Sequence, residues 1–384
     1  MTTPRLRAKI KYFSDKVLSK LSPQLPLVAI DIGMSSFKFV RLKKNKNKTE
    51  KPELETVHLQ AHPTGLAEEE PERSSQLTAT CKQALTALKI KNSPIVVSVS
   101  GSSVIVREAK LPALAAEELA KSLAFEAEPF IPYDIKEVNL DYSITGKTQE
   151  DNQNKYEVIL IAAKKDLIEN RLSLVAASGR PIIVDVDAFA LANFATLLPD
   201  IDKETILIVN IGASISNLIV IERGTPKVVR DISIGSNAFN RSLESMLQMD
   251  ALTAETIKRE IGIIIDDHER ESLSTSGDSK KSEAAQNLVT TASDLITEIH
   301  KSIEFFLTHG QDRAVSKIYL TGGGALLKNI VVFTSAQLRI PVELLNPFDF
   351  LARPAQTSVA HETGPLFTVA CGLALRRWND WVKE

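Results

Sequence analysis

The stretch Leu27-Val-Ala-Ile-Asp-Ile-Gly-Met-Ser-Ser-Phe-Lys-Phe-Val40 decides the fold prediction for this chain. An apolar run brings Asp31 to the end of a buried strand, and after Gly33 a second run alternates as a strand does. The tight turn between them gathers backbone N–H groups that suit phosphate oxygens, and the carboxylate of Asp31 can hold a hydrated Mg²⁺ beside them. An Asp-x-Gly sequence is also common in hairpins without a ligand, so this stretch alone does not establish a site.

The same layout recurs in the second half of the chain. The stretch Ile206-Leu-Ile-Val-Asn-Ile-Gly-Ala-Ser-Ile-Ser-Asn-Leu-Ile-Val-Ile221 contains an apolar strand, a turn with serines and a second apolar strand. Asn210 stands two residues before Gly212, as Asp31 stands two residues before Gly33. Two copies so far apart in the sequence predict two similar half-domains that face each other across a cleft.

A third stretch is rich in glycine. Lys317-Ile-Tyr-Leu-Thr-Gly-Gly-Gly-Ala-Leu-Leu-Lys-Asn-Ile330 has the pattern of a strand that runs into three glycines and then into a helix. Gly322, Gly323 and Gly324 have no Cβ, so a flat ring or a ribose can come close to the backbone at this point. A nucleoside is the kind of ligand that such a turn suits.

The composition is that of an ordinary globular protein, and it excludes several function classes. The length of 384 residues predicts two to four subdomains. The hydrophobic fraction of 43% and the charged fraction of 24% are those of an ordinary globular protein. A net charge of −2 and 5% aromatic residues argue against a nucleic-acid partner. Cys81 and Cys371 fit no metal or redox spacing, and six scattered histidines argue against zinc. No apolar segment approaches the roughly 20 residues that cross a bilayer.

Residues 1–26 differ in composition from the rest of the chain. Between positions 4 and 21, Leu6, Ile10, Phe13, Val17 and Leu21 recur at helical spacing, and six lysines and arginines stand against one acid, Asp15. Such a basic amphipathic helix either lies on an anionic membrane surface or a partner, or packs on its own domain with its charges in solvent. The sequence leaves both interpretations open.

The remaining chain is predicted to form two lobes with an insertion. The first lobe begins with residues 27–103, and residues 104–186 form an inserted α+β subdomain with the order strand, helix, strand, strand, helix, strand. The second lobe covers residues 187–363. Within it, residues 271–283 are too polar to pack and are predicted to be a mobile loop. Residues 364–384 are predicted to close the chain as a helix.

The three motifs together resemble those of a known superfamily. Asp31-Ile-Gly-Met-Ser, Asn210-Ile-Gly-Ala-Ser and Thr321-Gly-Gly-Gly resemble the two phosphate motifs and the adenosine motif of the actin-like ATPases. Within this superfamily the chain resembles the PilM family of type IV pilus assembly proteins, which is similar to the division protein FtsA. The resemblance runs from about residue 27 to residue 378, and the inserted subdomain, of the SHS2 type, separates these families from actin. The basic N-terminal extension departs from the pattern.

This resemblance implies a fold, a ligand and a partner. The fold would be the two-lobed actin-like α/β fold, also called ribonuclease H-like. ATP and Mg²⁺ would bind in the central cleft, and a groove would dock the N-terminal tail of a PilN-like inner-membrane protein. The protein would then lie in the cytoplasm, at the inner face of the inner membrane.

The resemblance also implies a role for each motif residue. Asp31 would position Mg²⁺ through water, and Lys38 either supplies charge to the phosphates or is a solvated strand lysine. Either Lys258 or Glu260 would reach the ribose, since residues i and i+2 do not share a helix face, or both lie on a surface helix. The turns would supply Gly33, Met34, Ser35 and Ser36 to the β-phosphate, Gly212, Ala213, Ser214 and Ser216 to the γ-phosphate, and Gly322, Gly323 and Gly324 beneath the nucleoside.

One departure from the superfamily pattern bears on catalysis. Asn210 stands where an aspartate is usual, and Ser216 where a threonine is usual. An asparagine can accept a hydrogen bond from a metal-bound water, but it has no negative charge and cannot act as a general base. We therefore expect ATP binding with little or no hydrolysis, and assign no catalytic residue. The alternatives are an active ATPase of the same superfold, or a self-associating, FtsA-like membrane tether anchored through residues 4–21.

Overall fold

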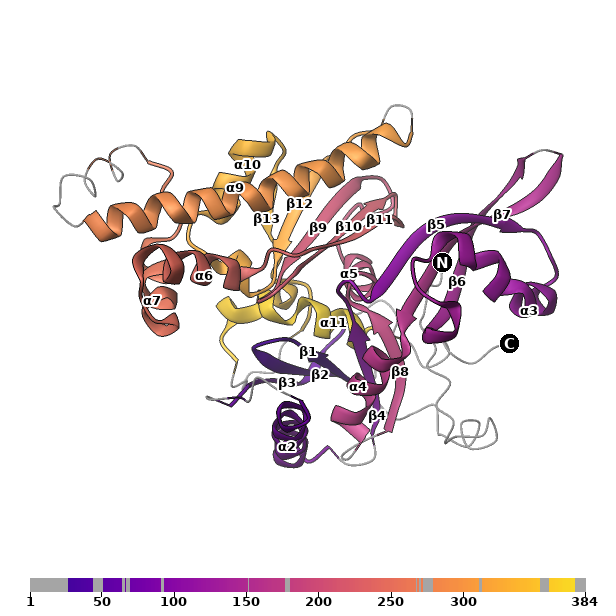
Figure 1. The fold of residues 1–384 in the computed structure, drawn as a ribbon, viewed down its shortest axis with the longest axis horizontal. Helices are drawn as coiled ribbons and strands as arrows, with labels where there is room; N and C mark the ends of the chain where they lie inside the picture. Colours follow the sequence, from indigo (N-terminus) through magenta and orange to yellow (C-terminus); the bar gives the residue numbers. More distant parts are fainter. Residues whose placement is uncertain are drawn as a thin grey trace. The chain divides into compact units, whose positions relative to one another are not determined.

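The computed structural model describes residues 27–43, 51–63, 66, 70–90, 93–150, 152–176, 180–266, 268, 271, 279–310, 313–352 and 359–376. The basic extension 1–26 lies outside the described residues, as does the middle of the predicted loop 271–283. The chain divides into two compact units, which Figure 1 draws as one ribbon. Unit 1 comprises Met1–Leu197, Phe348–His361 and Val369–Glu384, and unit 2 comprises Leu198–Pro347 and Glu362–Thr368.

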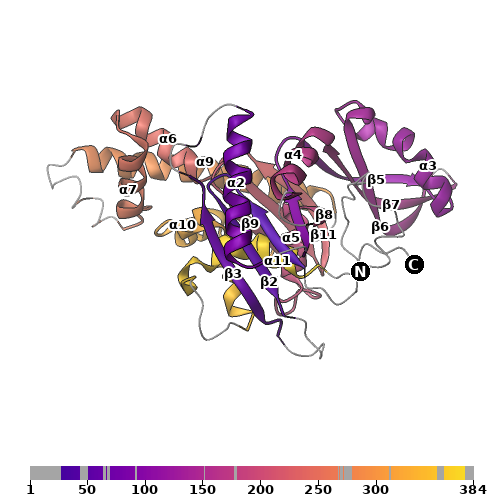
Figure 2. The ribbon, with the colours of Figure 1, turned by 90° about the horizontal axis from the view of Figure 1, so that it is seen from below.

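Unit 1 is built on a five-stranded sheet of order β3-β2-β1-β4-β8. Its first three strands are antiparallel, and β4 and β8 continue the sheet in parallel with β1. Every residue of β4 is buried, as expected for a central strand covered on both faces. Helices α2 and α4 cover one face and α5 covers the other (Figure 1 and Figure 2). The bounds are β1 Val28–Ile32, β2 Ser36–Leu42, β3 Leu54–Ala61, α2 Glu72–Ala87, β4 Pro94–Val99, α4 Lys165–Ala176, β8 Arg180–Val186 and α5 Asp187–Ala195.

A smaller α+β body is inserted between β4 and α4. Its three-stranded sheet has the order β5-β7-β6, and α3 packs on it around a core of its own. The bounds are β5 Val104–Pro112, α3 Ala116–Ala127, β6 Val138–Glu150 and β7 Gln153–Lys164, with short 3-10 turns at Glu128–Phe130 and Ile135–Glu137. The prediction of an insertion over 104–186 was too long, because β8 pairs with β4 and so belongs to the larger sheet.

Unit 2 repeats the sheet of unit 1. Its strand order is β11-β10-β9-β12-β13, again with an antiparallel side and a parallel side. The predicted duplication of a half-domain is therefore confirmed. The strands are β9 Thr205–Ile211, β10 Ser216–Glu222, β11 Thr225–Ile232, β12 Lys317–Thr321 and β13 Val342–Leu344.

Helices α6, α7, α9, α10 and α11 and several 3-10 turns complete the description of unit 2 and the chain end. Helix α9 begins at Ser279, so the last five residues of the predicted loop 271–283 are helical. The described part of the predicted closing helix divides into the turn His361–Phe367 and α11 Thr368–Ala374. None of the described helices is both long and apolar enough to cross a membrane. The remaining bounds are α6 Ser236–Leu247, α7 Ala251–Ile261, α9 Ser279–Thr308, α10 Ile330–Leu338 and the turns Gly323–Leu326 and Pro347–Asp349.

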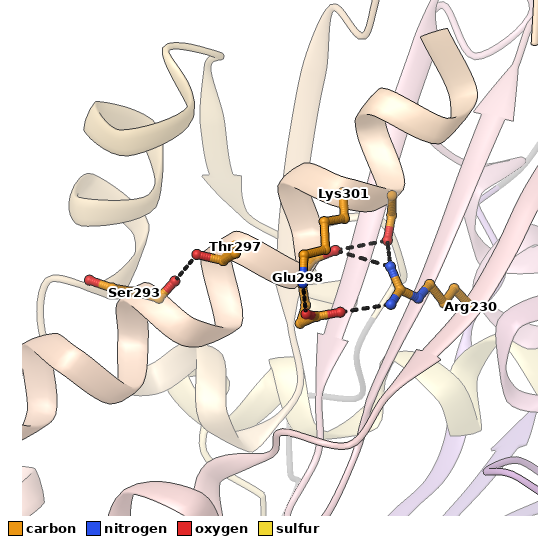
Figure 3. Close-up of polar contacts among 6 residues, drawn as sticks. Arg230, Ser293, Thr297, Glu298 and Lys301 are labelled. Atoms are coloured by element: carbon orange, nitrogen blue, oxygen red, sulfur yellow. Dashed lines mark hydrogen bonds and ion pairs between the residues drawn. The ribbon is translucent and has the colours of Figure 1, made fainter. Parts of the chain in front are cut away.

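One polar contact fastens α9 to the outer strand β11. The Arg230 guanidinium donates to the Glu298 carboxylate at 2.7 Å and to the Ser302 hydroxyl at 3.1 Å (Figure 3). Lys301 pairs with the other carboxylate oxygen of Glu298 at 2.6 Å. This contact fixes which side chains of β11 face the helix, and it thereby turns the neighbouring Asp231 to the opposite face of the strand.

Candidate functional site

The turn between β1 and β2 is a tight hairpin closed by Gly33. The Gly33 N–H donates to the Ser36 carbonyl at 3.1 Å, and Asp31 and Lys38 are opposite partners in the ladder. A Cβ added to Gly33 would lie 2.6 Å from Lys38 Nζ and 3.2 Å from the Ser36 carbonyl oxygen. Any larger residue would therefore push the lysine away from the turn.

The two strands next to this turn carry one acidic side chain, Asp31, and one basic side chain, Lys38. Lys38 Nζ lies 3.2 Å from Asp31 Oδ2, and the two side chains are only 12% and 13% exposed. The interpretation of Lys38 as a solvated strand lysine is therefore wrong. Met34 and Ser35 form the exposed apex, whereas Ser36 is buried.

Two further residues hold this turn, and the sequence interpretation missed both. Arg171 Nη1 in α4 donates to the Ile32 carbonyl at 2.8 Å, and the backbone N–H of His62 donates to the Ser35 carbonyl at 3.0 Å. Burial lowers the pKa of His62 to about 4, and the positive charge of Lys38 adds to this effect. The neutral imidazole thus borders a turn with two cations close to it.

The turn between β9 and β10 has the same hydrogen bond and the same register. The Gly212 N–H donates to the Ile215 carbonyl at 3.0 Å, and Asn210 and Asn217 are opposite partners. A Cβ on Gly212 would lie 2.7 Å from the Ile215 carbonyl oxygen. Asn210 and Asn217 are thus the structural equivalents of Asp31 and Lys38.

The carbonyl groups of this second turn are bound by helix α6. Backbone N–H groups at the start of α6 donate to the Gly212 and Ala213 carbonyls, each at 2.8 Å. Ala213 and Ser214 are half-buried at the turn. Ser216 is fully buried, and its hydroxyl donates to the Ile234 carbonyl at 2.6 Å. We therefore withdraw the assignment of the Ser216 hydroxyl to a phosphate.

A row of polar side chains crosses β9, β10 and β11. Asn210 Nδ2 donates to Asn217 Oδ1 at 3.0 Å, and Asn217 Nδ2 donates to Asp231 Oδ1 at 2.8 Å. Asp231 is an acid that the sequence interpretation missed, because it lies on the strand after the hairpin. Knowledge of the β10–β11 register was needed to find it.

The glycine turn after β12 packs against the end of β9. Gly322 has a φ of +84°, and a Cβ there would lie 2.5 Å from both Asn210 Oδ1 and the Ile211 carbonyl oxygen. A Cβ on Gly324 would collide with the Ile211 side chain. Gly323 is exposed, and the nearest atom to its Cβ position is Leu366 Cγ at 3.8 Å. Close packing therefore explains Gly322 and Gly324, and Gly323 has the space that an external ligand needs.

The two α7 residues assigned to the ribose are placed very differently. Lys258 is buried and pairs with Glu255 at 2.6 Å, whereas Glu260 is exposed and pairs with Lys281 at 2.6 Å. Burial opposes ionisation of Glu255, but hydrogen bonds from Lys258, Asn240 and Arg259 outweigh it and hold its pKa at about 2. The structure thus does not bring Lys258 and Glu260 together.

The residues of the first hairpin fit a nucleotide that carries Mg²⁺. Among the described residues, no group of three or more His, Cys, Asp and Glu side chains could hold a metal by itself. Mg²⁺ in nucleotide sites usually takes one or two protein carboxylates and fills its other positions with phosphates and water. Asp31 is such a carboxylate, and the Gly33 turn is a cradle that a Cβ would fill.

Comparisons with known proteins agree with the fold. The family model described as type IV pilus assembly protein PilM matches residues 29–378. A chain in the solved PilM-PilN type IV pilus biogenesis complex is 25% identical with a TM-score of 0.75, and the match covers 92% of this chain and 98% of that one. Ethanolamine utilization protein EutJ from Carboxydothermus hydrogenoformans is 14% identical with a TM-score of 0.51, over 92% and 90% of the two chains. The predicted actin-like fold is confirmed.

Proposed function

Because the chain belongs to the type IV pilus assembly protein PilM family, we propose that it is a nucleotide-binding assembly protein that docks a PilN-like membrane protein. The PilM relative was solved in a complex with PilN. For this chain, the proposed partner segment is the N-terminal tail of such a protein at the inner face of the inner membrane. The protein would then act as the cytoplasmic part of a pilus assembly complex.

The proposed nucleotide is ATP with Mg²⁺, and the observation that carries this is the Asp31–Lys38 pair beside the Gly33 turn. Mg²⁺ would supply positive charge to the phosphates. Asp31 would orient its water ligands, and Lys38 would donate to a phosphate oxygen. Backbone N–H groups of the turns and of Gly323 would take part in binding the phosphates and the nucleoside.

We propose that bound ATP is hydrolysed slowly or not at all. Asn210 occupies the place that corresponds to Asp31, and an amide cannot take a proton from water. Its Nδ2 group is already committed to Asn217. Asn210 would therefore bind and orient without acting as a base.

ATP binding would change the affinity for the PilN-like tail. A ligand shifts a conformational equilibrium only by its different affinity for the two states, so the effect must appear as a change in tail affinity. The test is calorimetric titration of a synthetic tail peptide into the full chain, with and without Mg²⁺–ATP. Affinities that are equal in the two titrations would remove nucleotide control from the proposal and leave the docking itself standing.

An active ATPase is the second candidate, and Asp231 favours it. This acid is linked to Asn210 through Asn217. A phosphate-release assay with an Asp31→Ala control separates the two candidates. Robust release that depends on Asp31 would establish the enzyme.

Residues 4–21 form a separate part of the proposal. Their basic amphipathic pattern suits a peripheral contact with anionic lipid, and in an FtsA-like tether this contact would accompany self-association. Co-sedimentation with anionic liposomes, for the full chain and for residues 27–384, tests the contact. Equal sedimentation of the two proteins would rule it out.

A further inference from the structure

We propose that Asp231 is a positioning residue that fixes the orientation of the Asn210 amide. In this orientation Asn210 presents its carbonyl oxygen, rather than its NH₂ group, to the hydrated cation of a bound nucleotide. The last step rests on the proposed nucleotide binding, whereas the orientation itself is a property of the free protein.

The argument starts from the chemistry of the three side chains. An ionised carboxylate only accepts hydrogen bonds, whereas a side-chain amide donates from its nitrogen and accepts at its oxygen. Asn217 therefore has to turn its Nδ2 toward Asp231, at 2.8 Å. Its Oδ1 then faces Asn210, which has to donate its own Nδ2, at 3.0 Å. The remaining Oδ1 of Asn210 points away from the row.

The position of the Asn210 oxygen shows where this orientation directs it. The Oδ1 atom of Asn210 lies 2.5 Å from the position that a Cβ on Gly322 would occupy, so the oxygen is on the side of the glycine turn. The other end of the row is also fixed, because Arg230 binds Glu298 and Ser302 on α9 (Figure 3). Alternation along β11 then keeps Asp231 on the face of its ladder partner Asn217.

This row of side chains changes how the asparagine at position 210 is interpreted. The negative charge that the motif lacks is present at Asp231, two strands away. Because Asp231 orients the Asn217 amide, and Asn217 in turn orients the Asn210 amide, this charge fixes which end of the Asn210 amide faces the ligand. An aspartate at position 210 would place a carboxylate at each end of the row. The Asn217 oxygen would then face the carboxylate of residue 210, and neither of the two groups could donate a hydrogen bond. Asn210→Asp alone is therefore unfavourable.

The test is a cycle of variants that needs no nucleotide. Asn210→Asp should lower the melting temperature by about 2–4 °C or more, the shift expected from losing one hydrogen bond of this kind. Adding Asp231→Asn moves the carboxylate to the other end and allows the reversed row, so the double variant should recover most of the loss at unchanged net charge. Asp294→Asn, on the exposed face of α9, is the control for the charge change and should melt like the parent.

A spectroscopic measurement separates orientation from stability. In protein labelled with ¹⁵N-asparagine, the Asn210 NH₂ proton that is donated to Asn217 should exchange about tenfold more slowly than the protons of an exposed asparagine, because it is hydrogen-bonded. Asp231→Asn should abolish this protection, since a row of three amides is satisfied in either direction. Unchanged protection in Asp231→Asn, or a double variant no more stable than Asn210→Asp, would overturn the proposal.

Titration of nucleotide completes the test. Asp231→Asn should weaken binding of Mg²⁺–ATP about tenfold relative to Asp294→Asn, and should leave binding of Mg²⁺-free ATP unchanged. If the parent protein binds no nucleotide, the proposed function fails while the variant cycle still decides the orientation. If nucleotide binds and the cycle shows no coupling, only the role of Asp231 fails.

Discussion

Lys38 lies across the first hairpin from Asp31, with its Nζ 3.2 Å from the Asp31 Oδ2 atom. At the equivalent place in the second hairpin, Asn217 lies across from Asn210, with 3.0 Å between the Asn210 Nδ2 and Asn217 Oδ1 atoms. The duplicated fold thus contains one charged and one neutral version of the same turn. Mg²⁺–ATP carries charges of both signs, and the first hairpin offers it an ionised carboxylate and an ammonium group. We therefore expect the first hairpin to contribute most of the affinity for Mg²⁺–ATP.

Replacing Lys38 with alanine should weaken Mg²⁺–ATP binding about tenfold, because a charge-assisted contact to phosphate is lost. Calorimetry measures the effect. Lys43→Ala is the matched control, since Lys43 follows the same strand and pairs with Glu53 in solvent. Tighter binding by Lys38→Ala would show that the lysine mainly competes with Mg²⁺ for Asp31.

Two glycines of one turn should respond very differently to alanine. Gly322→Ala should cost about 2 kcal/mol or more of unfolding free energy, because its positive φ and the close Asn210 oxygen both exclude a Cβ. Gly323→Ala should stay within about 0.5 kcal/mol, since its nearest neighbour is at van der Waals distance. Urea unfolding measures both. Equal losses would contradict the packing of this turn on β9.

The stability of the α6–α7 region should depend on Glu255 between about pH 4.5 and pH 2. Its pKa in the folded protein is about 2, against an ordinary 4.5, so its stabilising effect is complete above pH 4.5 and is lost as the pH falls through this window. Glu255→Gln should cost about 1–2 kcal/mol at pH 7, and this cost should shrink toward pH 3.

Denaturant unfolding of the parent and the Glu255→Gln variant, at several pH values, measures this change. Glu260→Gln is the control, because its ion pair with Lys281 is exposed. A cost of Glu255→Gln that stays constant from pH 7 to pH 3 would show that the carboxylate charge does not stabilise the fold.

A buried ion pair within unit 1 holds the segment after α11 to strand β8. Arg376 donates to Asp185, and the two side chains are 1% and 0% exposed. Arg376→Ala should cost about 3–5 kcal/mol, because it leaves a buried carboxylate without its main partner. Lys203→Ala removes an exposed pair and should cost less than about 1 kcal/mol. Urea midpoints that fall equally in both variants would contradict this assignment.

The sequence allowed the two hairpins to be predicted because their signals are local. Alternating residues, a glycine and the polar residue two places before it all lie within a few positions. The packing of Gly322 against Asn210 joins residues far apart in the chain, and no local pattern reports it.

The errors share one physical cause, which is contact between residues that only the folded register brings together. Strand β8 belongs to the larger sheet because it pairs with β4, across the whole insertion. Arg171 reaches the Ile32 carbonyl from a helix far along the chain, and Asp231 meets Asn217 only in the folded register. The Ser216 hydroxyl binds the carbonyl of Ile234, beyond the end of β11, and no local pattern reports this contact.

The most direct test of the account follows the fate of ATP on the full chain. Calorimetry should show one Mg²⁺–ATP bound per chain, with binding that is lost in Asp31→Ala, and chromatography of the bound nucleotide after prolonged incubation should recover ATP rather than ADP. An absence of binding heat, or conversion to ADP that depends on Asp31, would contradict the account.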